Sequence, residues 1–538
     1  MVSSHRLVIK DAAWQLIGRI ISALFWFLTI KIITPYLWPL QYGDYSTILK
    51  YFAIWTALAD LWLYVLAVKR LWAIKEASNI WKTSEKSEKR IWDPSDSSDN
   101  SSVFSELKTE YGKFVGTRLI IMSVIYIVAI VVAYLLPAYT SNPYLVWGLP
   151  FGMIFSASFM YAGIQQLPLQ IFWRMDKLSR SLIVARLSQI AILIPVVFFI
   201  FKNMTFDGST VSLIAFCCIM FSVVASSIGQ NVQIHLSANK LLKLKIIFDR
   251  KFTKQIIIRN RQYGVSYYLS SFHTLIVLLF LWWFFPTSSG HDYTGIWALS
   301  LSLIEILLII PSALGNSLLH KISSYSLLNK RKSIGNLLVL ITWIGAIIAV
   351  NFWLFADQII LVVSWKAFLW SFASLTTRWS NQILPFLGIV LFFSFIKQVY
   401  NYLFVAIDKQ NVLLPINLTW VIVGIFLWIR LIPHYWLFGW VVTQFTIETL
   451  FMLGAMRVAR RKKSQPLFAW KTAFRLLFPL VIMTIVGYLI TYFFAINVLR
   501  FFIIALPLNL LMVYFSLRPI KKIAKGLTVE DAGISEVW

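Results

Sequence analysis

Apolar runs of about 20 residues recur from one end of the chain to the other, separated by shorter polar connections. A helix of about 20 residues, rising about 1.5 Å per residue, is long enough to cross the roughly 30 Å hydrocarbon core of a bilayer. The pattern therefore predicts an all-α integral membrane protein. Fourteen spanning helices are expected, over residues 12–34, 46–68, 114–137, 144–170, 181–201, 210–236, 263–285, 294–320, 335–356, 382–407, 410–430, 433–457, 474–495 and 498–517.

Two sequence echoes indicate an internal repeat. The turn at 43–46, before the second predicted helix, is similar to 295–298 before the eighth, and 172–177 after the fourth is similar to 404–409 after the tenth. Both echoes relate helices that are six apart, and many transporters are built from two related halves. We therefore expect two pseudo-symmetric six-helix lobes around a central cavity. The expected division is an N-terminal lobe over 1–236, a basic cytoplasmic linker over 237–262, a C-terminal lobe over 263–457, two appended helices over 458–517 and a cytoplasmic tail over 518–538.

Composition narrows the class of protein. Hydrophobic residues make up 59% of the 538 residues and charged residues only 13%, against about 25% charged in soluble domains. The net charge of +27 does not indicate nucleic-acid binding, because no solvated basic domain is present. Most of the 49 Lys and Arg residues fall instead in connections on one side of the predicted membrane, including 69–113, 237–262 and 457–471. The positive-inside rule then predicts a multi-pass protein of the cytoplasmic membrane with both termini in the cytoplasm.

Polar side chains recur at helical spacing on several predicted spans, although a charge at the bilayer centre costs roughly 2.5–3.5 kcal/mol. Gln15, Arg19 and Ser22 fall near one face of the first span, and the second, eighth and tenth spans carry similar stripes. Such faces favour a shared aqueous cavity. Its predicted charged side chains are the basic Arg19, Lys31, Lys50, Arg118, Arg186 and Lys397 and the acidic Asp60, Glu305 and Glu448. The excess of basic residues predicts a cationic cavity, and Arg is well suited to bind phosphate through two hydrogen bonds.

The basic residues differ in what their positions favour. Arg19 lies on the most consistent polar stripe, so it is the leading candidate for substrate contact, with a structural ion pair as the alternative. Lys50 and Lys397 fit substrate binding and a structural role equally well. For the basic residues nearer helix ends, snorkelling to the headgroups is the favoured interpretation; these are Lys31, Arg118 and Arg186.

The acids Asp60, Glu305 and Glu448 either bind a coupling proton or cation or form salt bridges with neighbouring basic residues. The six His residues show no metal-ligand spacing. The sequence contains no phosphate-cradling GxxxxGK[ST], no HExxH and no Gly-x-Ser-x-Gly. We therefore expect a protein that is not an enzyme and that uses no metal or cofactor. Energy would come from an ion gradient, the membrane potential, substrate supply or a partner.

Three connections carry further expectations. The polar insertion at 69–113 predicts a cytoplasmic loop. The basic stretch 240–262 is interpreted either as an interfacial helix attracted to anionic headgroups or as an ordinary cytoplasmic loop. The Trp-rich segment 357–381 predicts an outer segment lying in the headgroup layer.

Several motifs together resemble a known family. They are DAAWQLIGRIIS at 11–22, YGDYS at 42–46, TALAD at 56–60, GIWA at 295–298, PSALGN at 311–316, and Ile432-Pro433 followed by Gly439 and Glu448. This set resembles the polysaccharide-unit (O-antigen type) flippases of the multidrug/oligosaccharidyl-lipid/polysaccharide (MOP) exporter superfamily, over most of residues 1–460. Trp62 departs from the pattern, because these proteins often have Gly there.

The resemblance implies two six-helix lobes around a V-shaped cavity lined mainly by helices 1, 2, 7 and 8. It also implies export of a polyprenyl-pyrophosphate-linked oligosaccharide to the outer leaflet by alternating access. Arg19 would then contact the pyrophosphate, with Lys50 and Lys397 as further candidates, and the partners would be this glycan lipid, membrane lipids and a coupling cation or proton. The alternatives are a lipid II-type flippase or a multidrug/cation antiporter of the same superfamily and, from a different class, a membrane glycosyltransferase or polysaccharide polymerase.

Overall fold

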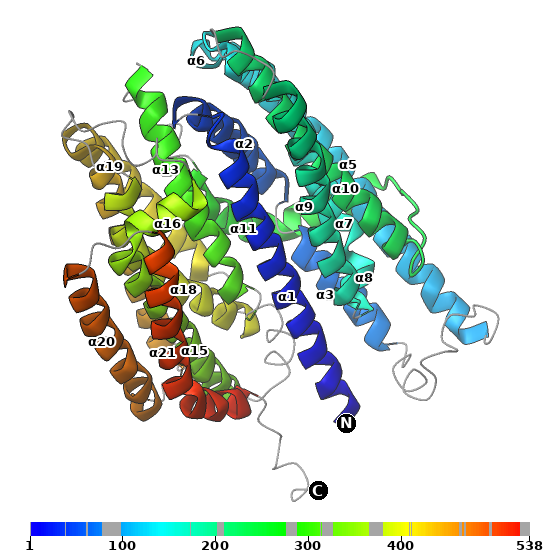
Figure 1. Ribbon diagram of the computed structural model, residues 1–538. Helices are drawn as coiled ribbons and strands as arrows, with labels where there is room; N and C mark the ends of the chain where they lie inside the picture. Colours follow the sequence, from blue (N-terminus) through cyan, green and yellow to red (C-terminus); the bar gives the residue numbers. More distant parts are fainter. Residues whose placement is uncertain are drawn as a thin grey trace, which may run out of the picture. The chain divides into compact units, whose positions relative to one another are not determined.

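In the computed structural model, the regular secondary structure of the described residues is entirely helical, and no β-strand occurs among them (Figure 1). It describes residues 2–37, 39–60, 63–77, 98–172, 174–201, 209–275, 288–312, 327–364, 380–407, 412–461, 470–493 and 498–527, together with 314, 409, 465 and 466. Eleven segments within these ranges are long and apolar enough to cross a bilayer, and each coincides with a predicted span. The other three predicted spans, 12–34, 46–68 and 263–285, fall on helices as far as they are described. The all-α membrane fold is thus confirmed, while the number fourteen stays a prediction.

The chain forms two compact units, Met1–Leu37 with Asp44–Phe280, and Trp38–Gly43 with Leu281–Trp538. The expected lobe boundaries at 236 and 263 remain predictions. Unit 1 contains α1 (Val2–Ile33), most of α2 (Pro39–Asp60), α3 (Leu63–Ala77), α5 (Ser98–Leu135), α6 (Pro137–Thr140), α7 (Pro143–Gln165), α8 (Leu167–Ile171), α9 (Met175–Pro195) with the π-helical η1 (Val196–Phe201), α10 (Ser209–Ala238) and α11 (Arg250–Leu275). The helices α7, α9 and α10 pack together, and α1 packs on α9.

Small residues allow α1 to approach α9 closely. A Cβ at Gly18 would collide with the side chain of Ser179, and the Ser179 hydroxyl donates to the carbonyl of Trp14 at 2.6 Å. Membrane helices depend on such close packing, because lipid tails are as apolar as the side chains they would replace. The contact fixes one face of α1 against α9, and Arg19 follows directly after Gly18 on that helix.

The polar insertion at 69–113 is more helical than predicted. The helix α3 continues to Ala77, and α5 begins at Ser98, so both ends of the insertion are helical; residues 78–97 lie outside the described part. The span predicted over 46–68 is described as α2 and α3, and Trp62 falls between them, outside the described residues.

Unit 2 contains α13 (Ser288–Leu307), α15 (Leu327–Leu354), α16 (Ala356–Val363), α18 (Ser380–Ala406), α19 (Leu413–Arg461), α20 (Trp470–Phe493) and α21 (Val498–Leu527). Within it α18 packs against α15 and α19, and α20 and α21 pack against α15 and each other. Asn351 of α15 and Asn509 of α21 exchange two side-chain hydrogen bonds, of 3.0 and 2.9 Å. The Trp-rich stretch 357–381 begins as α16, and residues 365–379 lie outside the described part.

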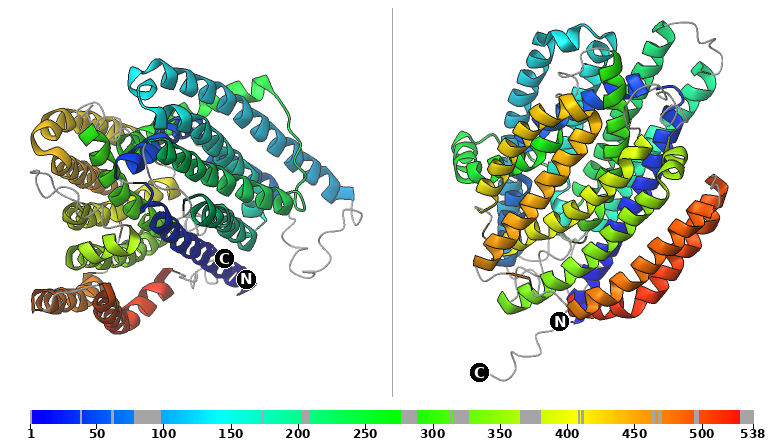
Figure 2. Two further views of the ribbon diagram at one scale, coloured as in Figure 1. Left: turned by 45° about the horizontal axis from the view of Figure 1, so that its top comes forward. Right: turned by 90° about the vertical axis from the view of Figure 1, so that its left-hand side faces the viewer.

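The helix α19 is a hairpin that turns near Pro433 (Figure 2). The rings of Trp428 and Trp440 stack with centroids 4.9 Å apart, and the backbone of Gly439 lies against the carbonyl of Leu431. Residues eight and twelve positions apart would not meet on a straight helix, because each residue adds about 1.5 Å. The hairpin therefore supplies two candidate spans, Leu413–Tyr435 and Leu437–Arg461, with the turn a few residues later than the sequence predicted.

Gly439→Ala is expected to lower the free energy of unfolding by about 1–3 kcal/mol, the usual cost of forcing extra volume into a packed site, because the new Cβ would collide with the Leu431 carbonyl. The matched control is Gly454→Ala on the same hairpin, where the nearest atom lies 3.6 Å from the added Cβ. Thermal unfolding of the purified protein in detergent measures both. Equal melting temperatures for the two variants would contradict the hairpin contact.

Candidate functional site

A buried ion pair joins α2 to α5 in unit 1. An Nη2 of Arg118 lies 2.9 Å from Oδ1 of Asp60, and Arg118 is only 4% exposed. Arg118 therefore does not snorkel to the headgroups, and that interpretation is wrong: its guanidinium points into the unit and meets the acid of a neighbouring helix. For Asp60, the salt bridge that the sequence left open against ion coupling is present.

Polar groups from three further helices surround this ion pair. Tyr64 of α3 donates to Gln170 of α8, and Tyr126 of α5 hydrogen-bonds Thr56 of α2 at 2.7 Å. On α7, a Cβ at Gly163 would lie 3.2 Å from the Arg118 guanidinium, so the absence of a side chain leaves room for it. The pair thus sits at a convergence of five helices.

The guanidinium of Arg118 keeps spare donor capacity. Besides the contact with Asp60, Nη2 donates to the Met160 sulfur at 3.2 Å. Its Nε and Nη1 are buried and find no hydrogen-bond partner among the described residues. Unsatisfied buried donors are rare and are commonly met by water or a ligand. This position can therefore accept a water or an anionic oxygen beside Asp60.

Arg19 lies half-buried on α1, and its charge reaches the same cluster. Tyr64 lies within electrostatic range of Arg19, Arg118 and Asp60, so the three charges occupy one neighbourhood of unit 1. Lys50 is half-buried on α2, ten positions before Asp60 and so about 15 Å from it along the helix. It belongs to the same unit but not to the same cluster.

Unit 2 has a buried ion pair of its own, between α18 and α19. The Lys397 ammonium lies 3.1 Å from Oε1 of Glu448, and Gln444 donates to the same oxygen at 3.1 Å. The ammonium also lies 5.1 Å from the ring centre of Phe451. Lys397 and Glu448, which the sequence placed in separate roles, neutralise each other here. The salt bridge expected as one interpretation of Glu448 is present, and its role in ion coupling stays a prediction.

The eighth and tenth predicted spans also share polar contacts in unit 2. Ser312 follows α13, and its hydroxyl and carbonyl accept from Gln398 and Tyr402 of α18, at 3.4 and 3.1 Å. Glu305 is half-buried on α13. Three further polar residues predicted for these spans, Asn316, His320 and Asp408, lie outside the described residues.

The predicted charged set divides unevenly between the units. Unit 1 holds five of the six basic residues and one acid, namely Arg19, Lys31, Lys50, Arg118, Arg186 and Asp60; unit 2 holds Lys397, Glu305 and Glu448. The surplus of positive charge therefore belongs to unit 1, and unit 2 carries more acid than base in this set. Within the described residues no group of His, Cys, Asp and Glu is placed to hold a metal ion.

One of the two echoed turns makes a close contact within unit 2. A Cβ at Gly295 of α13 would collide with the carbonyl of Pro39, and it would lie 3.1 Å from the amide nitrogen of Gly43. The segment 39–43 can therefore lie against α13 only because residue 295 has no side chain. The sequence paired these two glycines as equivalent positions in a repeat, and they are also neighbours in space.

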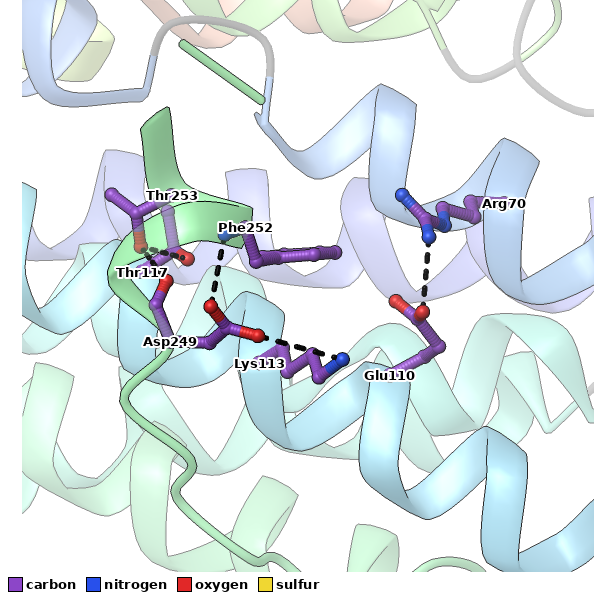
Figure 3. A network of polar contacts seen from close by, with 7 residues as sticks. All are labelled: Arg70, Glu110, Lys113, Thr117, Asp249, Phe252 and Thr253. Atoms are coloured by element: carbon purple, nitrogen blue, oxygen red, sulfur yellow. Dashed lines mark hydrogen bonds and ion pairs between the residues drawn. The ribbon is translucent and has the colours of Figure 1, made fainter. Parts of the chain in front are cut away.

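A second polar network holds the start of α11 against α5 (Figure 3). Asp249 immediately precedes α11; its Oδ1 accepts from the amide of Phe252 at 3.0 Å, as an N-cap does, and its Oδ2 lies 3.6 Å from the Lys113 ammonium. Thr253 and Thr117 share a hydrogen bond of 2.9 Å. The hydrogen bond from the Phe252 amide, then the charge of Lys113, holds the pKa of Asp249 below its usual range, so the carboxylate keeps its charge at a lower pH than a free aspartate would.

The same network reaches α3 and the connection before α11. Arg70 of α3 pairs with Glu110 of α5 at 3.0 Å and lies 5.1 Å from the ring centre of Phe252. Gly112 and Gly116 let the extended backbone around 245–247 lie on α5, where the amide of Ile247 donates to the Gly112 carbonyl at 3.1 Å. The basic stretch 240–262 thus includes an extended segment followed by the first turns of α11, and an interfacial position of its helical part stays a prediction. The contacts also place parts of 69–113 and 237–262 at the same end of unit 1, as the charge distribution predicted.

Comparison with known proteins identifies the fold. No protein-family model matches the chain, and no curated protein matches its sequence. A lipid II flippase MurJ in an inward closed conformation has a similar structure, with a TM-score of 0.61 and 12% identity over 96% of this chain and 98% of that one. An inward-facing multidrug resistance MATE family transporter of the MOP superfamily gives 0.54 and 12%, over 84% and 99%. A MOP superfamily transporter from Pyrococcus furiosus, described by the reverse polarity of its binding pocket, gives 0.52 and 12%, over 85% and 96%.

The chain has the fold of MOP transporters. At 12% identity these likenesses establish the fold alone.

Asp60→Asn and Arg118→Gln are each expected to destabilise unit 1 by about 3–5 kcal/mol, because removing one partner leaves the other charge buried and unpaired. The double variant Asp60→Asn/Arg118→Gln is expected to recover much of the loss. Unfolding of the purified protein in detergent measures this cycle, and additive losses would show that the two side chains do not interact.

Proposed function

We propose that the chain is a flippase that moves a polyprenyl-pyrophosphate-linked oligosaccharide from the cytoplasmic to the outer leaflet by alternating access. The observation that carries the proposal is the surplus of basic side chains on unit 1 of a MOP transporter fold. A pyrophosphate bears the negative charge and the oxygens that Arg and Lys bind, and a neutral or cationic cargo would gain nothing from these residues.

The extent of the structural likeness supports a flippase over a multidrug transporter. The MurJ structure covers 96% of this chain, whereas the MATE structure covers 84%. A larger part of this chain therefore has no equivalent in the MATE structure than in the MurJ structure.

Arg19 is the proposed pyrophosphate contact, and Lys50 is a second candidate on the next helix. Lys397 is a weaker candidate for substrate binding than the sequence indicated. Its ammonium lies 3.1 Å from Oε1 of Glu448, which balances its charge. The pair Asp60–Arg118 lies in the same neighbourhood as Arg19. We propose that protonation of Asp60 or binding of a cation there would release Arg118 and so couple an ion to transport, while Glu305 and Glu448 are the corresponding candidates in unit 2.

Two alternatives within the fold remain open to test. A lipid II-type flippase would use the same basic residues, since its cargo also carries a pyrophosphate, and the similarity to MurJ favours it. A multidrug/cation antiporter would use the acids, and the acidic balance of unit 2 favours it. A glycosyltransferase or polymerase has no structural observation in its favour.

We also propose that the protein lies in the cytoplasmic membrane with both termini in the cytoplasm. The positive-inside distribution supports this, together with the contact between Lys113 and Asp249, which brings the two basic connections together at one end of unit 1. Activity of an alkaline phosphatase fused to the C-terminus, which requires export, would contradict it.

Arg19→Ala is expected to reduce translocation at least tenfold, because the pyrophosphate loses its proposed partner. Purified protein in proteoliposomes is supplied with a fluorescent polyprenyl-pyrophosphate oligosaccharide, and the fraction reaching the far leaflet is read with a membrane-impermeant quencher. Parallel vesicles carry lipid II or an organic cation, with and without an imposed potential.

Two variants serve as controls for this assay. Arg19→Lys keeps the charge but loses bidentate binding, so partial activity is expected. Arg430→Ala removes an exposed basic residue of α19 and is expected to transport normally. Wild-type protein that moves none of the pyrophosphate-linked cargoes would refute the flippase, whereas full activity of Arg19→Ala would refute only the role of Arg19.

A further inference from the structure

An apolar groove of about 710 Å³ lies between α20 and α21, on the two appended helices of unit 2. Its long sides are formed by Phe478, Ile482 and Val486 of α20 and by Leu508, Leu511 and Phe515 of α21. Several of these side chains are strongly exposed, including Phe478 at 67% and Phe515 at 64%. In a membrane such side chains face lipid, so the groove is open to the bilayer.

The groove has charge at one end only. Arg475 of α20 and Arg518 of α21 both line it there, and no other charged side chain among the described residues does. The two helices run in opposite directions, since Arg475 lies near the start of α20 and Arg518 near the end of α21, while Val486 and Leu508 line the other end. Two arginines thus line one end of a groove that is otherwise apolar.

The length of the groove matches one leaflet of a membrane. From Arg475 to Val486 the helix α20 rises by about 16 Å at 1.5 Å per residue, and half of the roughly 30 Å hydrocarbon core is about 15 Å. An occupant whose phosphate lies between the two arginines would therefore place its apolar chain along the groove and end near the bilayer midplane.

We propose that this groove binds one anionic phospholipid of the leaflet that faces the Arg475–Arg518 end. Charge complementarity selects the occupant, because a guanidinium pair favours a phosphate that carries a net negative charge over a zwitterionic headgroup. The positive-inside rule assigns this end to the cytoplasmic leaflet, where anionic lipids are concentrated. The lipid is a resident of the protein and not its cargo, so the inference stands apart from the proposed function.

The test compares lipid retention by wild-type protein and by Arg475→Gln/Arg518→Gln. Purified protein is stripped with detergent, titrated with an anionic phosphatidylglycerol and with phosphatidylcholine of the same chains, and bound lipid is counted by native mass spectrometry. Wild-type protein is expected to prefer the anionic lipid. The double variant is expected to bind it roughly thirtyfold more weakly, equivalent to about 2 kcal/mol at about 1 kcal/mol per basic residue.

The matched control is Arg460→Gln/Arg461→Gln, which removes the same charge from the exposed end of α19 and is expected to bind the anionic lipid like wild type. Leu511→Trp fills the groove at a lipid-exposed position and is expected to weaken binding of both lipids. Equal affinity of wild-type protein for the two headgroups would overturn the proposal, as would an equal loss in both Arg pairs. Displacement of the phospholipid by stoichiometric polyprenyl phosphate would also overturn it, since the groove would then serve cargo.

Discussion

A charged side chain inside the hydrocarbon layer must meet water or an opposite charge, and this constraint shapes both units. Arg118 and Glu448 are only 4% and 3% exposed, and each meets its counter-charge on another helix of its own unit. The pairs tie α2 to α5 and α18 to α19. Because either partner alone would be strongly unfavourable, the ion pairs specify which helix faces which as well as adding attraction.

The two ion pairs show that the predicted charged residues are divided unevenly between the units. Apart from the pairs Asp60–Arg118 and Lys397–Glu448, the basic residues of the predicted set all lie in unit 1, and the third acid, Glu305, lies in unit 2. Counting the nine predicted charged residues together gives one net charge for the cavity. That number does not show how the charges are divided between the two units.

Hydrophobic periodicity was sufficient to predict the membrane helices, because a span needs a continuous apolar run whatever it packs against. It also separated the two arms of α19 at Pro433. It could not predict that Arg118 is paired, because position near a helix end favours snorkelling until the partner helix is known. The connection before α11 was unpredictable for the same reason: its extended course depends on the bare surface that Gly112 and Gly116 leave on α5. The roles of Arg19, Lys50 and Glu305 stay predictions, since no ligand contact bears on them.

Four glycines lie where a carbonyl from a connection or a helix end approaches a helix. The extended segment before α11 lies against Gly112 and Gly116. The carbonyl of Pro39 lies against Gly295, and the carbonyl of Leu431 lies against Gly439. In each case backbone meets backbone, so polar groups at the end of a span lie against other protein atoms and away from lipid. The polar network around Asp249 then fixes the first of these contacts by side chains that can ionise at the membrane edge. Apolar runs thus place helices in the membrane, while glycines and edge charges determine how the ends of those helices are joined.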